Sequence, residues 1–450
     1  MKMKIRKRWV GYLLGFLLTP GVQAQNMEEA KMAVANMRVG WNIGNSMDSN
    51  SGDVTNMWIE QWTSRTPTDY EKAWGQAPAT RALLHAFKEA GFNAVRIPVT
   101  WYPHYGTLNN NGLKWDMTKW TGYTVNAAWM RRVKQVVDYA MEEGMYCILN
   151  VHHDTGNAST AWIIANMESH DQYQERYTRL WTAIAKEFKD YDDHLLFEGY
   201  NEMTDKHHSW CFASFGAPGN YNAADAKDAY NAVNAYAQDF VTAVRATGGK
   251  NAERNLIVNT YAACCGAGTW NTHLQDPLKQ MVLPADVTEG HLIFQVHSYW
   301  NTNNWGSSQK TDIDKMLTNL NTYLIKKHDT PVIIGEWGSD AEGLDYNDAT
   351  QRQKLLNFAT YFTSRAKAKG ITCFYWMGLS DGADRANGTW TQPELRDAII
   401  KGYYGNEGYV DAMVGLTEKQ KDKALFSLTG QRITSHHKGI AVKNGRKIIQ

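Results

Sequence analysis

The sequence has few of the features that mark membrane, nucleic-acid and cofactor-binding proteins. After residue 24, no segment offers the roughly 20 consecutive apolar residues that a membrane-spanning helix needs. The 47 Lys and Arg residues nearly balance the 46 Asp and Glu residues, so a nucleic-acid partner has no electrostatic support. There is no glycine-rich phosphate-binding loop and no strand-end lysine suited to a Schiff base, which argues against an oxidoreductase or an aldolase.

Cysteine is also scarce. The five cysteines show no Cys-x-x-Cys or similar ligand spacing, so we expect no zinc and no cofactor. Cys147 and Cys373 lie in apolar runs typical of buried strands, where they would act as small core hydrophobes. Cys211 and the adjacent Cys264 and Cys265 fall in predicted loops. An oxidising compartment would permit a bridge between Cys211 and either of the other two.

Residues 1–24 are typical of a secretory signal peptide. Five basic side chains precede an apolar stretch at 10–18, and small residues at 22–24 offer a cleavage site. A transmembrane anchor is the alternative, but the stretch is about half of the roughly 20 residues that a spanning helix needs. Cleavage would remove five basic and no acidic residues, which changes the formal charge from +1 to −4. We therefore expect a secreted, periplasmic or cell-surface protein without an integral membrane segment.

Alternation of short apolar runs with amphipathic stretches over 25–415 is the pattern of β-α-β units. Eight apolar runs predict strands at 39–44, 94–98, 146–151, 195–199, 255–261, 292–296, 331–335 and 372–376. Helices are predicted between them at 79–90, 127–143, 173–189, 224–246, 313–327 and 351–369. Eight repeats favour an α/β fold of the closed (β/α)8 TIM-barrel type over an open sheet. Long loops follow the strands, notably at 46–78 and 205–223, on the face where such barrels bind substrates.

Residues 416–450 differ from the barrel in composition, with a Lys-rich stretch followed by strand-like alternation and several glycines. We interpret them as a short C-terminal β appendage. A disordered or edge-pairing extension is the alternative, because glycines at these intervals also make ordinary hairpins.

Polar residues stand where the apolar strands end, and a barrel brings those ends to one pocket. The residues concerned are Arg96, His152, His153, Asn201, Glu202, His297, Tyr299, Glu336 and Trp376. Among them, Glu202 and Glu336 suit glycosidic cleavage, which needs one acid to protonate the leaving oxygen and one carboxylate on the other face of the sugar. We expect Arg96 to keep Glu336 ionised by charge attraction, and His297 and Tyr299 to hydrogen-bond the two glutamates.

Each feature also has a structural interpretation. A strand-end glutamate can cap a helix or form a buried ion pair. His152 and His153 could be metal ligands, but adjacent strand residues point to opposite sides and no carboxylate spacing completes a site, so we expect no metal. A non-catalytic carbohydrate-binding barrel would also keep the tryptophans, although it would need neither glutamate.

Over roughly residues 39–376, the sequence resembles glycoside hydrolase family 5, the cellulase family. The string GWNIGN at 40–45 is similar to the opening strand of the family's endoglucanase and xyloglucanase branch, and NAVRIPVTW at 93–101 is similar to its second strand. The resemblance implies that Asn201 and Glu202 form the acid/base motif, and that Glu336 is the nucleophile. It adds a supporting shell of Arg96, His152, His297, Tyr299 and Trp376, and the first motif adds Trp41 and Asn45.

The resemblance also implies a retaining endo-β-1,4-glycanase that acts on a β-1,4-linked polysaccharide or oligosaccharide. An endo-β-1,4-glucanase is expected first, with xyloglucanase, xylanase and mannanase as alternatives. The loop at 46–78 is longer than in a plain endoglucanase, which leaves the preferred glycan open. The C-terminal tail resembles short β segments that serve as sorting signals in secreted proteins of Bacteroidetes.

Overall fold

The computed structural model describes residues 27–107, 114–376 and 383–405, together with short strands at 425–426, 432–433, 440–443 and 446–449. The predicted signal peptide lies outside these residues. Within the described part of the chain, no helix combines the length and apolar character that crossing a membrane requires.

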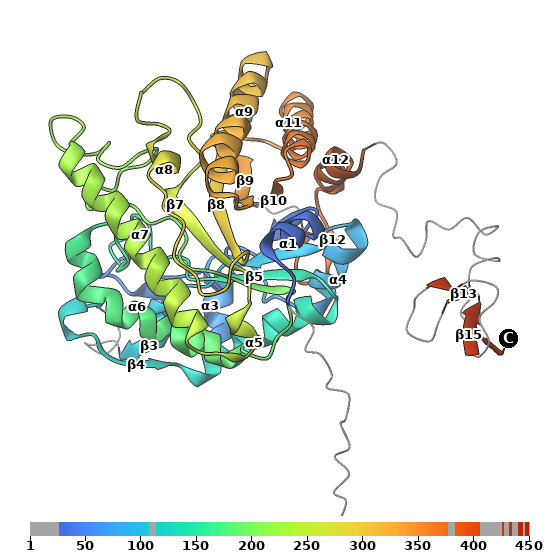
Figure 1. The fold of residues 1–450 in the computed structure, drawn as a ribbon, viewed down its shortest axis with the longest axis horizontal. Helices are drawn as coiled ribbons and strands as arrows, with labels where there is room; N and C mark the ends of the chain where they lie inside the picture. Colours follow the sequence, from blue (N-terminus) through green and yellow to red (C-terminus); the bar gives the residue numbers. More distant parts are fainter. Residues whose placement is uncertain are drawn as a thin grey trace, which may run out of the picture.

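Eight parallel strands close into a barrel in the order β1-β10-β9-β8-β7-β6-β5-β2, with helices around it (Figure 1). The prediction of a (β/α)8 barrel is therefore confirmed. The strands are β1 (Gly40–Asn42), β2 (Ala94–Ile97), β5 (Tyr146–Asn150), β6 (Leu195–Glu198), β7 (Leu256–Cys264), β8 (Leu292–Trp300), β9 (Val332–Ser339) and β10 (Thr372–Tyr375).

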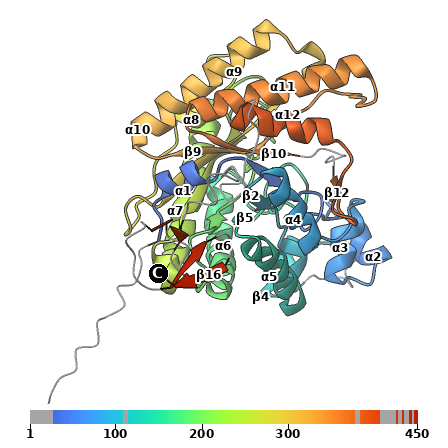
Figure 2. The same ribbon diagram turned by 90° about the vertical axis from the view of Figure 1, so that its right-hand side faces the viewer.

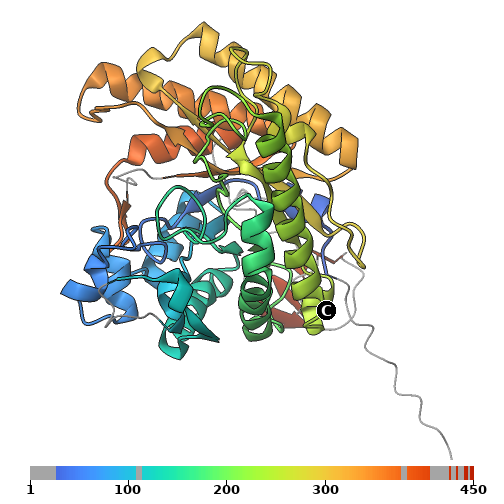
Figure 3. The same ribbon diagram turned by 90° about the vertical axis from the view of Figure 1, so that its left-hand side faces the viewer.

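Long helices form the outer layer. They are α4 (Arg81–Ala90), α5 (Ala127–Glu142), α6 (Met167–Glu187), α7 (Ala223–Arg245), α9 (Ser307–Leu320), α11 (Ala349–Ala368) and α12 (Pro393–Tyr404). Figure 2 shows α9, α11 and α12 stacked on one side of the barrel, and Figure 3 shows α6 and α7 side by side on another. A π-helical turn (Asn321–Ile325) joins α9 to α10 (Lys326–His328).

Side-chain caps define where several of these helices begin. The side chains of Asn126, Asn166, Asn222 and Asp348 accept hydrogen bonds from backbone amides in the first turns of α5, α6, α7 and α11. Each cap satisfies amide groups that have no partner inside the helix. Because Asn166 caps α6, the helix starts at Met167, six residues before the predicted 173. The first turn of α6 is polar and carries no apolar pattern, so the sequence pattern did not reveal this start.

The inside of the barrel changes from apolar to polar along each strand. Successive strand residues alternate between inside and outside, so residues two apart share a face. A lower layer of buried apolar side chains contains Ala94, Ile148, Leu196, Ile257, Ile293, Ile333 and Phe374. Two residues further along the same strands stand Arg96, Asn150, Glu198, Asn259, Gln295, Gly335 and Trp376. The apolar layer closes the barrel, and the polar layer above it supports the site.

The short helix α1 (Ala30–Asn36) closes the other end of the barrel. Its buried face, with Ala30, Ala33 and Val34, packs against the lower apolar layer. This packing places the amino-terminal end of the barrel against a helix and leaves only the carboxyl end open for chemistry.

The remaining elements lie in loops and in the tail. The long loop at 46–78 contains α2 (Trp58–Trp62) and α3 (Pro67–Ala73), and a hairpin of β3 (Tyr105–Thr107) and β4 (Thr121–Val125) follows β2. Short α8 (Asp276–Lys279) follows β7, and β11 (Ala383–Asp384) pairs with β12 (Thr389–Trp390). In the tail, β13 (Leu425–Phe426), β14 (Arg432–Ile433), β15 (Ile440–Lys443) and β16 (Arg446–Ile449) form a separate antiparallel sheet.

Candidate active site

Arg96 lies at the centre of the polar layer and binds two carboxylates. Its Nη1 donates to Glu336 Oε1 at 2.7 Å, while its Nε and Nη2 donate to the two oxygens of Glu198 at 2.6 and 2.7 Å. Burial alone would lower the pKa of the Arg96 guanidinium, but Glu198 and Glu336 raise it above its ordinary value. Two negative groups thus share one cation, so the charge of Glu336 is only partly balanced.

Glu198 is fully buried and accepts two hydrogen bonds from Arg96, whereas Glu336 accepts one. Burial would raise the pKa of its carboxyl group, but the charge and hydrogen bonds of Arg96 outweigh burial and lower it. Amide groups of Asn150 and Asn259 donate to the same carboxylate at 3.1 and 3.2 Å. The result is an ionised, fully hydrogen-bonded group that fixes the position of Arg96.

The second oxygen of Glu336 accepts a hydrogen bond from Tyr299 at 2.7 Å. Burial, reinforced by Glu336 and Glu202, raises the pKa of the Tyr299 hydroxyl well above its ordinary value, so Tyr299 stays a donor. With Arg96 on one oxygen and Tyr299 on the other, the carboxylate plane of Glu336 is fixed.

Glu202 faces Glu336 across a short gap. His297 Nδ1 lies 2.7 Å from Glu202 Oε1 and 3.4 Å from Glu336 Oε2. One oxygen of each glutamate and one nitrogen of His297 all lie within 4.8 Å of one another. The Glu202 side chain is 23% exposed and that of Glu336 only 5%, so Glu202 is the carboxyl group that solvent reaches more readily.

Two aromatic rings lie on the Glu336 side of this pair, where His152 Nε2 is 3.9 Å from Glu336 Oε1. The rings of His152 and Trp376 are stacked, with centroids 5.6 Å apart and planes within 8°. A Cβ atom on Gly44 would lie 2.6 Å from the Trp376 ring, so only glycine fits under the ring at that position. Burial, together with His153 and Arg96, lowers the pKa of His152 well below its ordinary value, which leaves its imidazole neutral.

The arrangement therefore offers an ionised carboxylate held by two donors, a more open carboxyl group across a short gap, and a flat aromatic surface for a ring. Such a set suits attack on a sugar ring with protonation of its leaving oxygen. The family model of cellulase (glycosyl hydrolase family 5) matches residues 51–381 of this chain. The chain belongs to glycoside hydrolase family 5. Its barrel is accordingly that of an enzyme that hydrolyses O-glycosyl bonds.

Related proteins agree with this assignment. Endoglucanase A of Clostridium longisporum is 32% identical over 395 residues, covering 85% of this chain and 67% of the relative. A broad-specificity family 5 endoglucanase from an uncultured bacterium is 46% identical, with a TM-score of 0.75 over 85% of this chain and 98% of that one. A family 5 enzyme of Prevotella bryantii B14, solved with a xyloglucan tetradecasaccharide, is 38% identical with a TM-score of 0.70, covering 84% and 99%. This family 5 enzyme is thus an endo-glycanase.

Most of the site residues predicted from the sequence of this family 5 enzyme meet in one place. Asn201 joins the network through Arg96, whose Nη2 donates to its side chain at 2.7 Å. His153 lies further out, with Nε2 3.7 Å from Asp48 Oδ2 and its ring against Trp74. Asn45 is half-buried and adopts φ 53° directly after Gly44, at the same end of β1.

The prediction for Trp41 was wrong. Its side chain is fully buried between the barrel and α4, where it packs against Phe87, Phe92, Tyr375 and Trp390. The physical reason is the alternation of β1, in which Asn42 points into the barrel and Trp41 points out toward the helices. Asn42 is the residue that contacts the site, since its side-chain oxygen accepts from Arg96 at 3.0 Å.

The inner support of the site was not predicted from the sequence. Its residues lie inside the predicted strands and were counted with their apolar runs; they are Asn42, Asn150, Glu198 and Asn259. The available signal was a polar residue inside an apolar run, because burying a charge or an amide costs free energy unless it is paired.

A cavity of about 470 Å³ opens beside Glu202. Glu202, His297 and Tyr299 form one end of it, and Trp210 and Trp270 line the rest. Trp270 is 61% exposed and Trp210 39%, which is unusual for such large apolar side chains. This cavity thus joins the side of the glutamate pair at Glu202 to the loops that carry Trp210 and Trp270.

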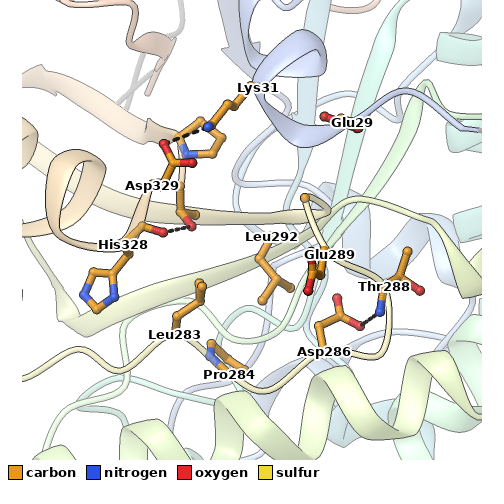
Figure 4. A pocket seen from close by; sticks show the side chains of 13 residues that line it. Glu29, Lys31, Leu283, Pro284, Asp286, Thr288, Glu289, Leu292, His328 and Asp329 are labelled. Carbon is orange, nitrogen blue, oxygen red and sulfur yellow. Dashed lines mark hydrogen bonds and ion pairs between the residues drawn. The ribbon is translucent and has the colours of Figure 1, made fainter.

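A second cavity, of about 530 Å³, lies at the opposite end of the barrel (Figure 4). It is lined by residues at the starts of β8 and β9, and Figure 4 shows Lys31 of α1 paired with Asp329 at 2.7 Å. Residues at this end of a (β/α)8 barrel serve stability rather than chemistry. We assign it no part in the reaction.

Within the described residues, three groups bring potential metal-ligating atoms within 4.8 Å of one another: Asp48, His152 and His153; Asp192, Asp193 and His194; and Glu202, His297 and Glu336. The third is the pair of glutamates with His297 that was described above. In the first, the side-chain amide of Asn150 lies 2.9 Å from His152 Nδ1 and engages that nitrogen. The second is a surface cluster.

Proposed function

We propose that this family 5 enzyme is an exported, retaining endo-β-1,4-glucanase, in which Glu336 is the nucleophile and Glu202 the acid/base. The observation that carries the proposal is the short gap between the two carboxyl groups. A gap of up to 4.8 Å between one oxygen of each fits the roughly 5–5.5 Å of retaining enzymes better than the roughly 6.5–9.5 Å of inverting enzymes.

In the first step, Glu336 attacks the anomeric carbon while Glu202 donates a proton to the departing glycosidic oxygen. Arg96 and Tyr299 hold the attacking carboxylate in one orientation, and Trp376 supports the sugar whose bond breaks. In the second step, Glu202 removes a proton from water, and the water oxygen displaces Glu336. The greater exposure of Glu202 suits a group that must meet both the leaving sugar and the water.

Glucan as the substrate is supported by the relatives, which are endoglucanases, and by the xyloglucan bound to the Prevotella bryantii enzyme. The proposal is tested by assaying reducing ends released from β-1,4-glucan, mixed-linkage glucan, xyloglucan, xylan and mannan. We expect the glucan-backbone substrates to be cleaved internally, with a rapid fall in viscosity. Preference for xylan or mannan would contradict the substrate assignment, and no cleavage of any of the five would contradict the enzyme assignment.

The exposed aromatics beside Glu202 give a second prediction. Because Glu202 protonates the leaving oxygen, the cavity next to it receives the leaving part of the chain, and its tryptophans offer stacking surfaces. Trp270→Ala should lower kcat/KM on polymeric glucan about 5- to 20-fold, equivalent to about 1–2 kcal/mol of lost stacking. It should leave hydrolysis of a nitrophenyl β-cellobioside, which has no sugar there, little changed.

Steady-state kinetics on the two substrates test this, with Trp270→Phe as the matched control. Phenylalanine keeps an aromatic face and should retain most of the activity on polymer. Equal losses on both substrates would place Trp270 in the fold or in the reaction centre rather than in binding the leaving chain.

A further inference from the structure

Three of the five cysteines meet on one wall of the cleft. Cys211, in the loop after β6, and the adjacent Cys264 and Cys265, at the end of β7, line the same cavity as Glu202. Cys147 and Cys373 are buried within β5 and β10. A bridge between the loop after β6 and the end of β7 must therefore involve Cys211, and the question is which of the two adjacent cysteines it joins.

The thiols of the adjacent pair have different surroundings. The Cys264 thiol contacts the backbone of Cys211 and lies 3.8 Å from the carbonyl oxygen of Ala262. The Cys265 thiol instead contacts the side chain of Ser298 on β8. The end of β7 is irregular at this point, and Ala262 and Ala263 both adopt positive φ of 48° and 51°. Both thiols lie close enough to Cys211 to interact with it electrostatically, but the backbone contact with Cys211 belongs to Cys264, which favours Cys264 as the partner.

Hydrogen bonds hold the two segments together close to these cysteines. The Tyr261 hydroxyl donates to the carbonyl oxygen of Ser209 at 2.9 Å, and the Ala262 amide donates to the carbonyl oxygen of Met203 at 3.1 Å. Ser209 and Tyr261 stand two and three residues before Cys211 and Cys264. The approach of the two cysteines is therefore set by backbone contacts nearby.

Cys211 itself adopts φ 69°, a left-handed conformation that costs free energy for a residue with a side chain. Its neighbour Trp210 lines the cavity on the leaving-group side. A disulfide bond at Cys211 would hold this strained turn in one position. It would thereby also fix the neighbouring Trp210 beside Glu202.

We infer that Cys211 and Cys264 form a disulfide bond in the exported enzyme and that this bond maintains the leaving-group side of the cleft. The inference rests on the proposed export and on the proposed function. An external disulfide, of a thiol oxidoreductase or of oxidised glutathione, accepts the electrons. The exposed Cys211 thiolate attacks it and releases one thiol; Cys264, as thiolate, then displaces the second thiol and forms the S–S bond.

Thiol counting tests the bond directly. With the full-length enzyme exported to a bacterial periplasm and denatured without reductant, we expect three of the five cysteines to react with a thiol reagent, and all five after reduction. Peptide mapping should find Cys211 joined to Cys264. Cys265→Ser is the matched control and should keep the bond, whereas Cys211→Ser should lose it. Five reactive thiols before reduction, or a link between Cys211 and Cys265, would overturn the inference.

Kinetics test the consequence. Reduction should raise KM on polymeric glucan about threefold with kcat little changed, as expected for weaker binding of the leaving chain. A variant with both Cys211→Ser and Cys264→Ser should behave like the reduced enzyme and no longer respond to reductant. Hydrolysis of nitrophenyl β-cellobioside should continue in every form. If the bond forms but reduction leaves KM on polymer unchanged, the stated role is wrong; loss of all activity on both substrates would instead contradict the proposed function.

Discussion

Replacing Glu336 with glutamine is expected to lower kcat on β-glucan at least about 10⁴-fold, because an amide cannot attack the anomeric carbon and no covalent intermediate forms. Glutamine has nearly the same shape and can still accept from Arg96, so the fold should persist. Kinetics on soluble glucan, together with the thermal unfolding midpoint, measure both effects.

Glu342→Gln is the matched control, since Glu342 is exposed and follows the end of β9. It should leave kcat and the unfolding midpoint little changed. A Glu336→Gln enzyme that retains more than about one-hundredth of the wild-type kcat would show that Glu336 is not the nucleophile.

Replacing Glu202 with alanine should also be severe on polymer, about 10³-fold or more, because the leaving oxygen of a sugar needs a proton. The loss should depend on the leaving group. A dinitrophenolate leaves without protonation, so Glu202→Ala should still form the glycosyl-enzyme with a dinitrophenyl β-cellobioside and then react slowly with water, which gives a burst of phenolate. Equal losses on glucan and on the activated substrate would contradict the acid role.

The two predicted losses differ because the surroundings of the two glutamates differ. Glu336 is buried with a donor on each oxygen, whereas Glu202 has His297 on one side and the open cavity on the other. The geometry thus separates a fixed carboxylate, which suits the proposed nucleophile, from a more open carboxyl group, which suits the proposed acid/base.

The barrel could be predicted from the sequence because its strands are apolar runs of the right length, and all eight occur where expected. The residues at which the strands end could not be predicted in the same way. The strands β7, β8 and β9 continue to Cys264, Trp300 and Ser339, several residues beyond the predicted ends. In β8 and β9 the apolar pattern stops where side chains become polar, but backbone pairing continues through His297 and Glu336, which belong to the site.

The position of the two glutamates at one end of the barrel could be predicted because each follows an apolar strand within a distinctive motif. The residues that hold the glutamates in place could not be predicted in this way. Glu198 pairs with Arg96, which is 102 residues away in the sequence, and no local pattern connects the two. The helices α1 and α12 were missed for a related reason: α1 is short, and the packing of α12 against α11 depends on the tertiary structure. The leaving-group cavity is likewise built from two irregular loops.

Azide offers the most direct test of the central claim that Glu336 is the nucleophile and Glu202 the acid/base. Azide needs no base, so it should restore turnover of dinitrophenyl β-cellobioside by Glu202→Ala through attack on the covalent intermediate. The measurement is the anomeric configuration of the glycosyl azide by proton NMR. Two inversions at the anomeric carbon predict the β-glycosyl azide from Glu202→Ala. An α-glycosyl azide from Glu202→Ala, or a β-glycosyl azide from Glu336→Gln, would contradict the assignment.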